Sequence, residues 1–105
     1  MADFAPVPGH VGFLAKRVFD RAGRVLDVSV AHLDPGGGGP EPAHRHPERD
    51  HLFIALEGTL EVRTPEGVHR FGPDEACLVK GETLHEIWNS DAGPAVVVGV
   101  TLAAE

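Results

Sequence analysis

Residues 44–58 read HRHPERDHLFIALEG and place three histidines at the start of an apolar strand. His44 and His46 stand two positions apart, and side chains with that spacing leave a β-strand on the same face, with Cα atoms about 7 Å apart. Both imidazoles can therefore reach one ion. Because neutral imidazole is a ligand for Zn, Cu, Fe and Ni, the stretch predicts half of a metal site on a β-barrel.

The third histidine of this stretch, His51, follows the polar segment PERD at 47–50. We interpret this segment as a hairpin loop, which would place His51 directly across from His46 on a neighbouring strand. Directly paired side chains have Cβ atoms about 5 Å apart, which suits a shared ligand sphere. The other histidines that stand alone are interpreted as solvated groups outside the site: His10, His32 and His69.

Glycine and proline divide the chain into short apolar segments, with 13 Gly and 9 Pro in 105 residues. This pattern predicts an all-β fold of brief strands joined by turns. We expect strands at 12–19, 25–33, 52–56, 59–63, 68–71, 76–79, 85–88 and 95–102. Hairpin turns are expected at 20–23 and 64–67. The glycine run at 36–39 is interpreted as a loop at the mouth of a barrel.

Length and charge limit the classes of partner. A chain of 105 residues is expected to form one domain over 1–105. Its net charge of -7 argues against nucleic acid or an anionic membrane and favours a small molecule. No apolar run of about 20 residues and no signal-peptide pattern is present, so we expect a cytoplasmic protein. The single cysteine, Cys77, excludes an internal disulfide and is interpreted as a buried core thiol.

Two segments, LFIAL at 52–56 and AVVVGV at 95–100, are apolar on both faces. A sheet with one face in water alternates apolar and polar residues, so something must cover the outer face of these strands. We predict a homodimer in which a second copy covers it. The alternative is a monomer whose own N-terminal strands provide the cover.

A second motif ends in His85 and, four residues later, Asn89, within GPDEACLVKGETLHEIWN at 72–89. Together the two motifs resemble those of the cupin superfamily. Its first motif has a glycine, then HxH, three or four residues, a Glu, six residues and a Gly. The residues that match it are Gly38 or Gly39, His44, His46 and Gly58. The resemblance covers 36–89 and implies a double-stranded β-helix, or jelly-roll barrel, with a metal inside.

This sequence departs from the family's pattern in two places. Lys80 and Glu82 stand where the second motif usually has Pro and Gly, and His51 stands at the position of the family's Glu. The resemblance then implies a four-histidine ligand set of His44, His46, His51 and His85. Asp50 is the alternative to His51, because the family's spacing also permits three intervening residues. Counting back from Gly58 favours His51.

Four imidazoles would hold a divalent transition metal, namely Fe, Zn, Ni, Mn or Cu, without neutralising its charge. Strand parity places Phe53, Ala55 and Ile87 on the same inner face as the ligands, and Trp88 outside. Two open metal positions would suit a small, oxygen-rich chelating substrate. The first hypothesis is therefore a metal-dependent enzyme, dioxygenase-like or cyclase/isomerase-like. The alternatives are a non-catalytic module that binds or senses a small ligand, and a closed structural zinc site.

Overall fold

The C-terminal strand illustrates how side-chain size shapes this protein. Along β9 (Ala95–Ala103) Val97 and Thr101 are buried, whereas Val96, Val98 and Val100 are half-buried on the other face. β-branched residues fit the pleated surface of a strand, so this segment is extended throughout. Because its inner residues are small, the strand leaves space inside the sheet.

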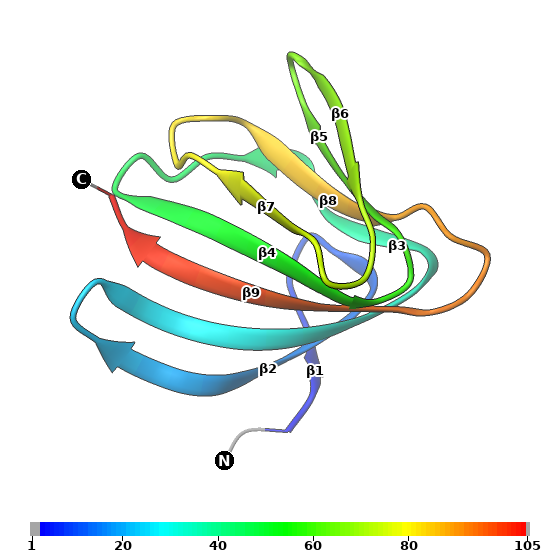
Figure 1. Ribbon diagram of the computed structural model, residues 1–105, viewed down its shortest axis with the longest axis horizontal. Coiled ribbons are helices and arrows are strands. Elements are labelled where there is room, and N and C mark those ends of the chain that lie inside the picture. Colours follow the sequence, from blue (N-terminus) through cyan, green and yellow to red (C-terminus); the bar gives the residue numbers. More distant parts are fainter. Residues whose placement is uncertain (1–2, 105) are drawn as a thin grey trace.

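The computed structural model describes residues 3–104 and consists of strands joined by turns and loops (Figure 1). The strands are β1 (Ala5–Pro6), β2 (Val11–Ala22), β3 (Val25–His44), β4 (Arg49–Glu57), β5 (Leu60–Thr64), β6 (Gly67–Phe71), β7 (Ala76–Val79), β8 (His85–Asn89) and β9. Among the described residues, no helix is long and apolar enough to cross a membrane.

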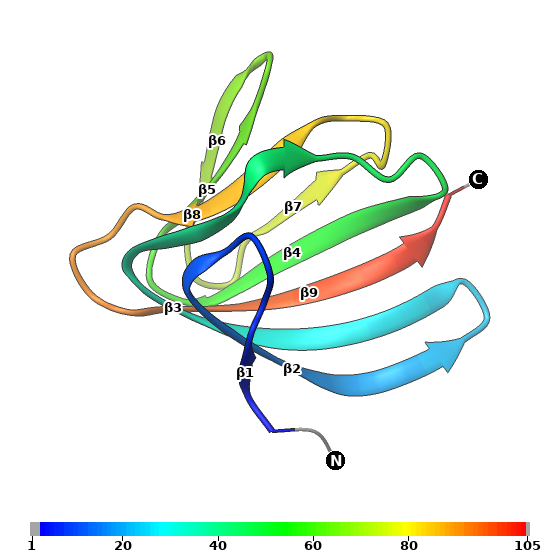
Figure 2. The same cartoon turned by 180° about the vertical axis from the view of Figure 1, so that it is seen from behind.

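The strands form a single antiparallel sheet that curls into a nearly closed barrel (Figures 1 and 2). Its order is β6-β5-β8-β3-β9-β4-β7, with β2 also paired to β3 and β1 to β2. The long strand β3 belongs to both halves, because residues 25–33 pair with β9 and residues 38–44 pair with β8. The all-β jelly-roll prediction is confirmed.

The core lies between the two halves of the barrel, and its largest fully buried side chains are Leu33, Leu60, Val62 and Val97. Leu33 and Val97 alternate along their strands with more exposed neighbours, as expected where one face of a sheet is buried, whereas on β5 Glu61 between Leu60 and Val62 is buried as well. Cys77 packs against this core but is only half-buried, and burial raises the pKa of its thiol.

The strand predictions agree with the structure apart from their ends, and the short β1 was not predicted. The turn at 64–67 is confirmed, since Thr64 pairs with Gly67. The turn predicted at 20–23 was placed too early. β2 continues to Ala22, which pairs with Val25, so the reversal occurs at residues 23 and 24.

The prediction of a hairpin between His46 and His51 was wrong. β3 and β4 are not neighbours, because β9 lies between them, and the connection at 45–48 passes from one half of the barrel to the other. His51 pairs with Thr101 on β9 and Val79 on β7. The residue directly across a strand pair from a site histidine is instead His85, which pairs with His44.

The glycine run at 36–39 is part of β3 and not the predicted loop. Gly38 and Gly39 pair with Trp88 and Ile87 of β8, and the backbone there approaches its neighbours closely. A Cβ on Gly38 would collide with the carbonyl oxygen of Ile87 and the ring of Trp88. Glycine is required here because β3 crosses between the two halves at a point with no room for a side chain.

Replacing Gly38 with alanine should therefore lower the free energy of unfolding by about 3 kcal/mol, the upper range for overpacking a filled site. Urea denaturation of the full chain measures this change. Gly93→Ala is the matched control, since a Cβ there meets no atom within 4 Å. Equal stability of the two variants would contradict this account of the glycine run.

Candidate functional site

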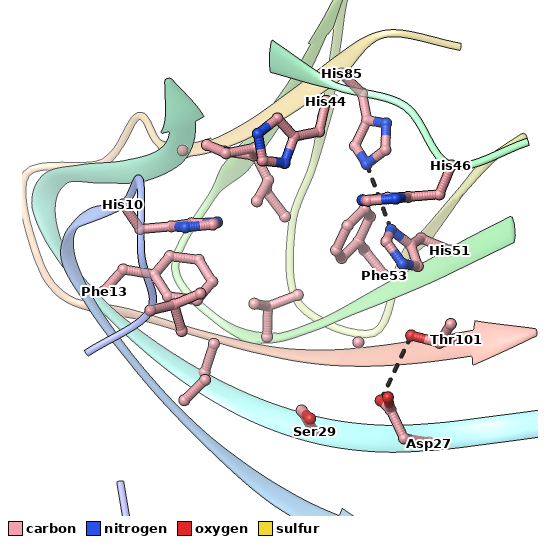
Figure 3. Close-up of a pocket in the computed structure, with 18 residues that line it drawn as sticks. His10, Phe13, Asp27, Ser29, His44, His46, His51, Phe53, His85 and Thr101 are labelled. Carbon is pink, nitrogen blue, oxygen red and sulfur yellow. Dashed lines mark hydrogen bonds between the residues drawn. The ribbon is translucent and has the colours of Figure 1, made fainter. Parts of the chain in front are cut away.

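The predicted histidines lie together on the wall of a cavity of about 270 Å³ between the halves of the barrel (Figure 3). The cavity is lined by Val7, His10, Phe13, Ala15, Asp27, Ser29, Ala31, Gly39, Pro40, His44, His46, His51, Phe53, His85, Ile87, Val97, Gly99 and Thr101. All four histidines proposed from the sequence belong to this set, although they come from three different parts of the sheet and from the connection at 45–48.

Different elements position the four histidines. His44 ends β3 and His85 begins β8, and their direct pairing brings the two Cβ atoms to within about 5 Å of one another. His51 enters from β4. His46 follows the end of β3, where its backbone N–H donates to the carbonyl of Gly81 and fixes the connection against the turn before β8.

The closest contact in the cluster joins His51 Nδ1 and His85 Nε2, which lie 3.4 Å apart. On its other side, His85 Nδ1 lies 2.9 Å from the backbone carbonyl oxygen of Thr83. A carbonyl only accepts, so Nδ1 carries the proton and the lone pair of Nε2 points toward His51. The backbone thus fixes the tautomer of His85, the usual arrangement behind a metal-binding imidazole.

Measured between ring centroids, the neighbouring pairs of the cluster have similar separations, and the His51 and His85 pair is the closest of the three. The ring centroids of His44 and His46 are 5.9 Å apart, those of His46 and His51 6.1 Å, and those of His51 and His85 5.4 Å. Within residues 3–104, no three His, Cys, Asp or Glu side chains converge in a geometry that would hold a metal ion as they stand. The histidines form a loose cluster in which one pair is already close.

Burial keeps the inner histidines uncharged. Burial, followed by the unfavourable interaction with a charged His85, lowers the pKa of His51 to about 4. Burial and the charge of Arg49 also lower the pKa of His46. Both imidazoles are therefore neutral near pH 7, and in this form each has a nitrogen lone pair that can bind a metal ion or accept a hydrogen bond.

Asp50, the alternative to His51, does not line the cavity. Its buried carboxylate accepts hydrogen bonds from the backbone N–H of Gly81 at 2.9 Å and from Lys80 Nζ at 3.1 Å. These two hydrogen bonds, the one from Gly81 foremost, lower the pKa of Asp50. The side chain connects the start of β4 to the turn before β8, so it supports the site from outside.

The Asp50→Asn variant should be less stable than the wild type at neutral pH, and the difference in stability should disappear in acid. The unfolded carboxyl has a pKa of about 3.9. Because the folded value is lower, the carboxylate stabilises the fold above that pH, and the contribution is lost as pH falls through the folded pKa. Thermal unfolding between pH 7 and pH 2 should show the two melting temperatures converging. Asp74→Asn, at an exposed carboxylate, should leave the profile unchanged, and a constant difference for Asp50→Asn would contradict the assignment.

Of the residues expected to shape the pocket, Phe53 and Ile87 line the cavity. Ala55 lies instead in the fully buried core and does not reach the lining. Trp88 lies on the opposite face of β8 from Ile87. Its indole N–H donates to Glu86 at 2.6 Å and its ring lies under the guanidinium of Arg63.

The sequence interpretation missed part of the lining. His10, interpreted as a solvated group, lies in the cavity wall with its ring centroid 4.5 Å from that of Phe13. Its Nδ1 donates to the carbonyl of Pro8 at 2.9 Å, so Nε2 is the acceptor. No local pattern marks His10, because the loop before β2 brings it to the cavity only in the folded chain. His32 and His69 are exposed and lie outside this cavity, as expected.

A polar group opposite the histidines was also missed. It consists of Asp27, Ser29 and Thr101, which lie on the inner faces of β3 and β9 (Figure 3). The sequence DVSV at 27–30 contained a signal, since its polar residues alternate with valines. In β3 the polar residues face the cavity and the valines face outward, the reverse of a strand with a wet outer face.

The fold and the histidine cluster define a small jelly-roll barrel with an internal cavity lined by histidines. A family model described as a cupin domain matches residues 29–101, which is more than half of the chain. The protein therefore belongs to the cupin family.

Known proteins similar to this chain are distant or matched over a short stretch. A 37-residue stretch is 46% identical to Germin-like protein 1-1 of Oryza sativa subsp. japonica, covering 35% of this chain and 17% of that protein. The cupin domain of Schizosaccharomyces pombe Cnp3 superposes with a TM-score of 0.81 at 14% identity, covering 98% of this chain and 69% of that one. The polyketide cyclase RemF from Streptomyces resistomycificus gives 0.75 at 22% identity, with 92% and 69% covered. These structural similarities support the fold.

Proposed function

We propose that the protein is a metal-dependent enzyme whose metal ligands are His44, His46, His51 and His85. The observation that carries the proposal is the 3.4 Å separation of His51 Nδ1 and His85 Nε2 on the wall of a cavity. Two nitrogens bound about 2.1 Å from one ion lie about 3.0 Å apart in neighbouring octahedral positions, the geometry that leaves two positions open beside four histidines. The observed separation exceeds this value by about 0.4 Å, so a small movement of either ring would bring the pair to the spacing of two ligands of the same ion.

The remaining donors fit a divalent transition metal in their chemistry. His46 is half-buried with a lowered pKa, and His44 is exposed at the end of its strand. Side chains in such positions have room to turn toward the His51 and His85 pair. Imidazole ligands suit Fe, Zn, Ni, Mn or Cu. A set of four imidazoles does not select among these metals, so the metal bound in the cell depends on which is available there.

The residues around the cluster indicate the kind of substrate. When bound, a divalent ion held by neutral ligands supplies a positive charge that stabilises an anionic oxygen. Phe53 and Ile87 provide apolar walls that exclude water beside the histidines. A cavity of about 270 Å³ lies near the lower limit for ligand pockets and suits a small molecule. The site is thus suited to a small, oxygen-rich chelating substrate in a dioxygenase-like or cyclase/isomerase-like reaction.

Protein purified without a histidine tag should contain about one transition metal ion per chain, and His85→Ala should weaken metal binding by more than about tenfold. Elemental analysis and competition with a chelator measure both quantities. His32→Ala is the matched control, because His32 is exposed and lies outside the cavity. Absence of metal after anaerobic reconstitution with iron, zinc, nickel and manganese would overturn the proposal.

Turnover of the metal-loaded protein then tests the enzymatic part of the proposal. Acetylacetone and catechol are suitable probes because both present paired oxygens to a metal. Oxygen consumption with product formation supports a dioxygenase-like reaction. Isomerised or cyclised product from a diketone or phenolic panel without oxygen uptake supports the other class. Tight binding of these compounds without any product would contradict an enzyme and favour a module that binds or senses a ligand.

We also propose that the protein is a homodimer. The outer faces of four adjacent strands carry an apolar patch, which consists of Val28, Val30, Leu52, Ile54, Leu56, Leu78, Val96, Val98 and Val100. Leu56 and Leu78 are more than half exposed. The alternative cover by the chain's own N-terminal strands is not supported, because β2 extends the edge of the sheet beside β3. A second copy presents the same apolar face and satisfies two-fold symmetry.

Sedimentation should give a mass of two chains for the wild type and one chain for Leu78→Glu, because the new carboxylate would be buried without a partner at the interface. Val68→Glu is the matched control, since Val68 is equally exposed but lies on β6, away from the patch. A monomeric wild type would contradict the proposed dimer.

A further inference from the structure

The polar group of Asp27, Ser29 and Thr101 is not part of the proposed ligand set. We propose that Asp27 accepts a hydrogen bond from a remote hydroxyl of the substrate. The cavity then selects molecules with an oxygen chelate at one end, a hydroxyl at the other and a planar carbon ring between them. This inference rests on the proposed function, because the chelate end is defined by the histidines.

Strand register places Asp27 relative to the histidines. Asp27 on β3 pairs with Thr101 on β9, and Thr101 pairs with His51 on β4. All three residues line the cavity, so they form a row across its floor (Figure 3). Neighbouring strands lie about 4.8 Å apart, so the backbones at Asp27 and His51 are separated by about 10 Å. A small molecule that contacts a histidine-bound ion can reach the carboxylate from within the cavity.

The carboxylate of Asp27 has capacity for a further donor. The hydroxyl of Thr101 donates to Oδ1 at 3.4 Å, at the long limit for a hydrogen bond. Among residues 3–104 no other hydrogen bond or ion pair reaches this side chain, which lines the cavity, so Oδ2 has no donor within this part of the chain. The other carboxylate discussed above, Asp50, is held by two donors. Asp27 thus differs from a structural carboxylate in its lack of close partners.

The chemistry of an acceptor-only group determines what it recognises. An ionised carboxylate has no proton to donate, so it requires a donor such as a hydroxyl. A ligand that covers Asp27 without a donor removes its water and leaves it unsatisfied, which weakens binding, whereas a hydroxyl forms a charge-assisted hydrogen bond. Asp27 therefore discriminates between otherwise identical molecules by the presence of a remote hydroxyl.

The cavity wall beside the row of Asp27, Thr101 and His51 is largely apolar. Strand register places Phe53 and Gly99, together with Ser29, in the next row, and Ala31 and Val97 in the row after it. Gly99 leaves space beside the Phe53 ring, since an added Cβ would lie 3.8 Å from its nearest atom. Such a surface fits the face of an aromatic or other planar ring. The substrate class is therefore a hydroxylated aromatic compound or a planar diketone with a distant hydroxyl.

The test compares benzohydroxamate with 4-hydroxybenzohydroxamate, which share a chelating end and a ring and differ in one remote hydroxyl. Calorimetric titration of the metal-loaded full chain should show about tenfold tighter binding of the hydroxylated probe, the effect of one hydrogen bond to a charged group. Asp27→Ala should abolish this preference, and the isosteric Asp27→Asn should reduce it. Glu57→Gln, at an exposed carboxylate outside the cavity, should preserve it.

Metal content measured on the same samples separates the two proposals. If the wild type holds metal and binds both probes equally, the role of Asp27 is overturned and the metal site stands. The same conclusion follows if Asp27→Asn and Asp27→Ala keep the full preference. If the wild type holds no metal and binds neither probe, the proposed function fails and this inference fails with it. Should Asp27→Ala not fold, the isosteric Asp27→Asn decides.

Discussion

The pairing of one long strand with two different partners determines the architecture of this protein. β3 pairs with β9 over residues 25–33 and with β8 over residues 38–44, so its two ends belong to opposite halves of the barrel. The glycines between these segments allow close approach of backbones where the strand changes partner. This arrangement places Asp27 at one end of β3 and His44 at the other, with the cavity between the halves that they join.

The interior of the barrel has two regions of different character. Toward Leu33 and Val97 the inner face is filled by apolar side chains, whereas toward Asp27 and Thr101 it carries small polar residues that do not fill the space. A filled core stabilises the fold through burial of apolar surface, and an unfilled polar region contributes little to that term. The polar residues at this end therefore add little to stability, and the proposed substrate gives them a role.

Local patterns in the sequence predicted the strands and the residues of the histidine cluster. They failed for features that depend on which strands, far apart in the chain, pair with one another. Alternation and turn residues are properties of neighbouring positions, so strands such as β7 were predicted with their correct bounds. Pairing of His51 with Thr101 depends on residues far apart in the chain, and adjacency in sequence wrongly suggested His46 as its partner. The same limit hid His10, which reaches the cavity only through the path of its loop.

Asp50 and Asp27 show that the fold, and not proximity in sequence to the histidines, determines which carboxylate reaches the cavity. Asp50 precedes His51 directly, yet its oxygens are occupied by Gly81 and Lys80 on the outer side of the site. Asp27 is separated from His51 by 23 intervening residues, 28 to 50, but shares the cavity floor with it through strand register. A neutral ligand set leaves a bound ion with its full charge, so the carboxylate inside the cavity adds a negative potential at the far end. The proposed substrate, anionic at the histidines and with a hydroxyl that donates a hydrogen bond to Asp27, would be complementary to both ends of this field.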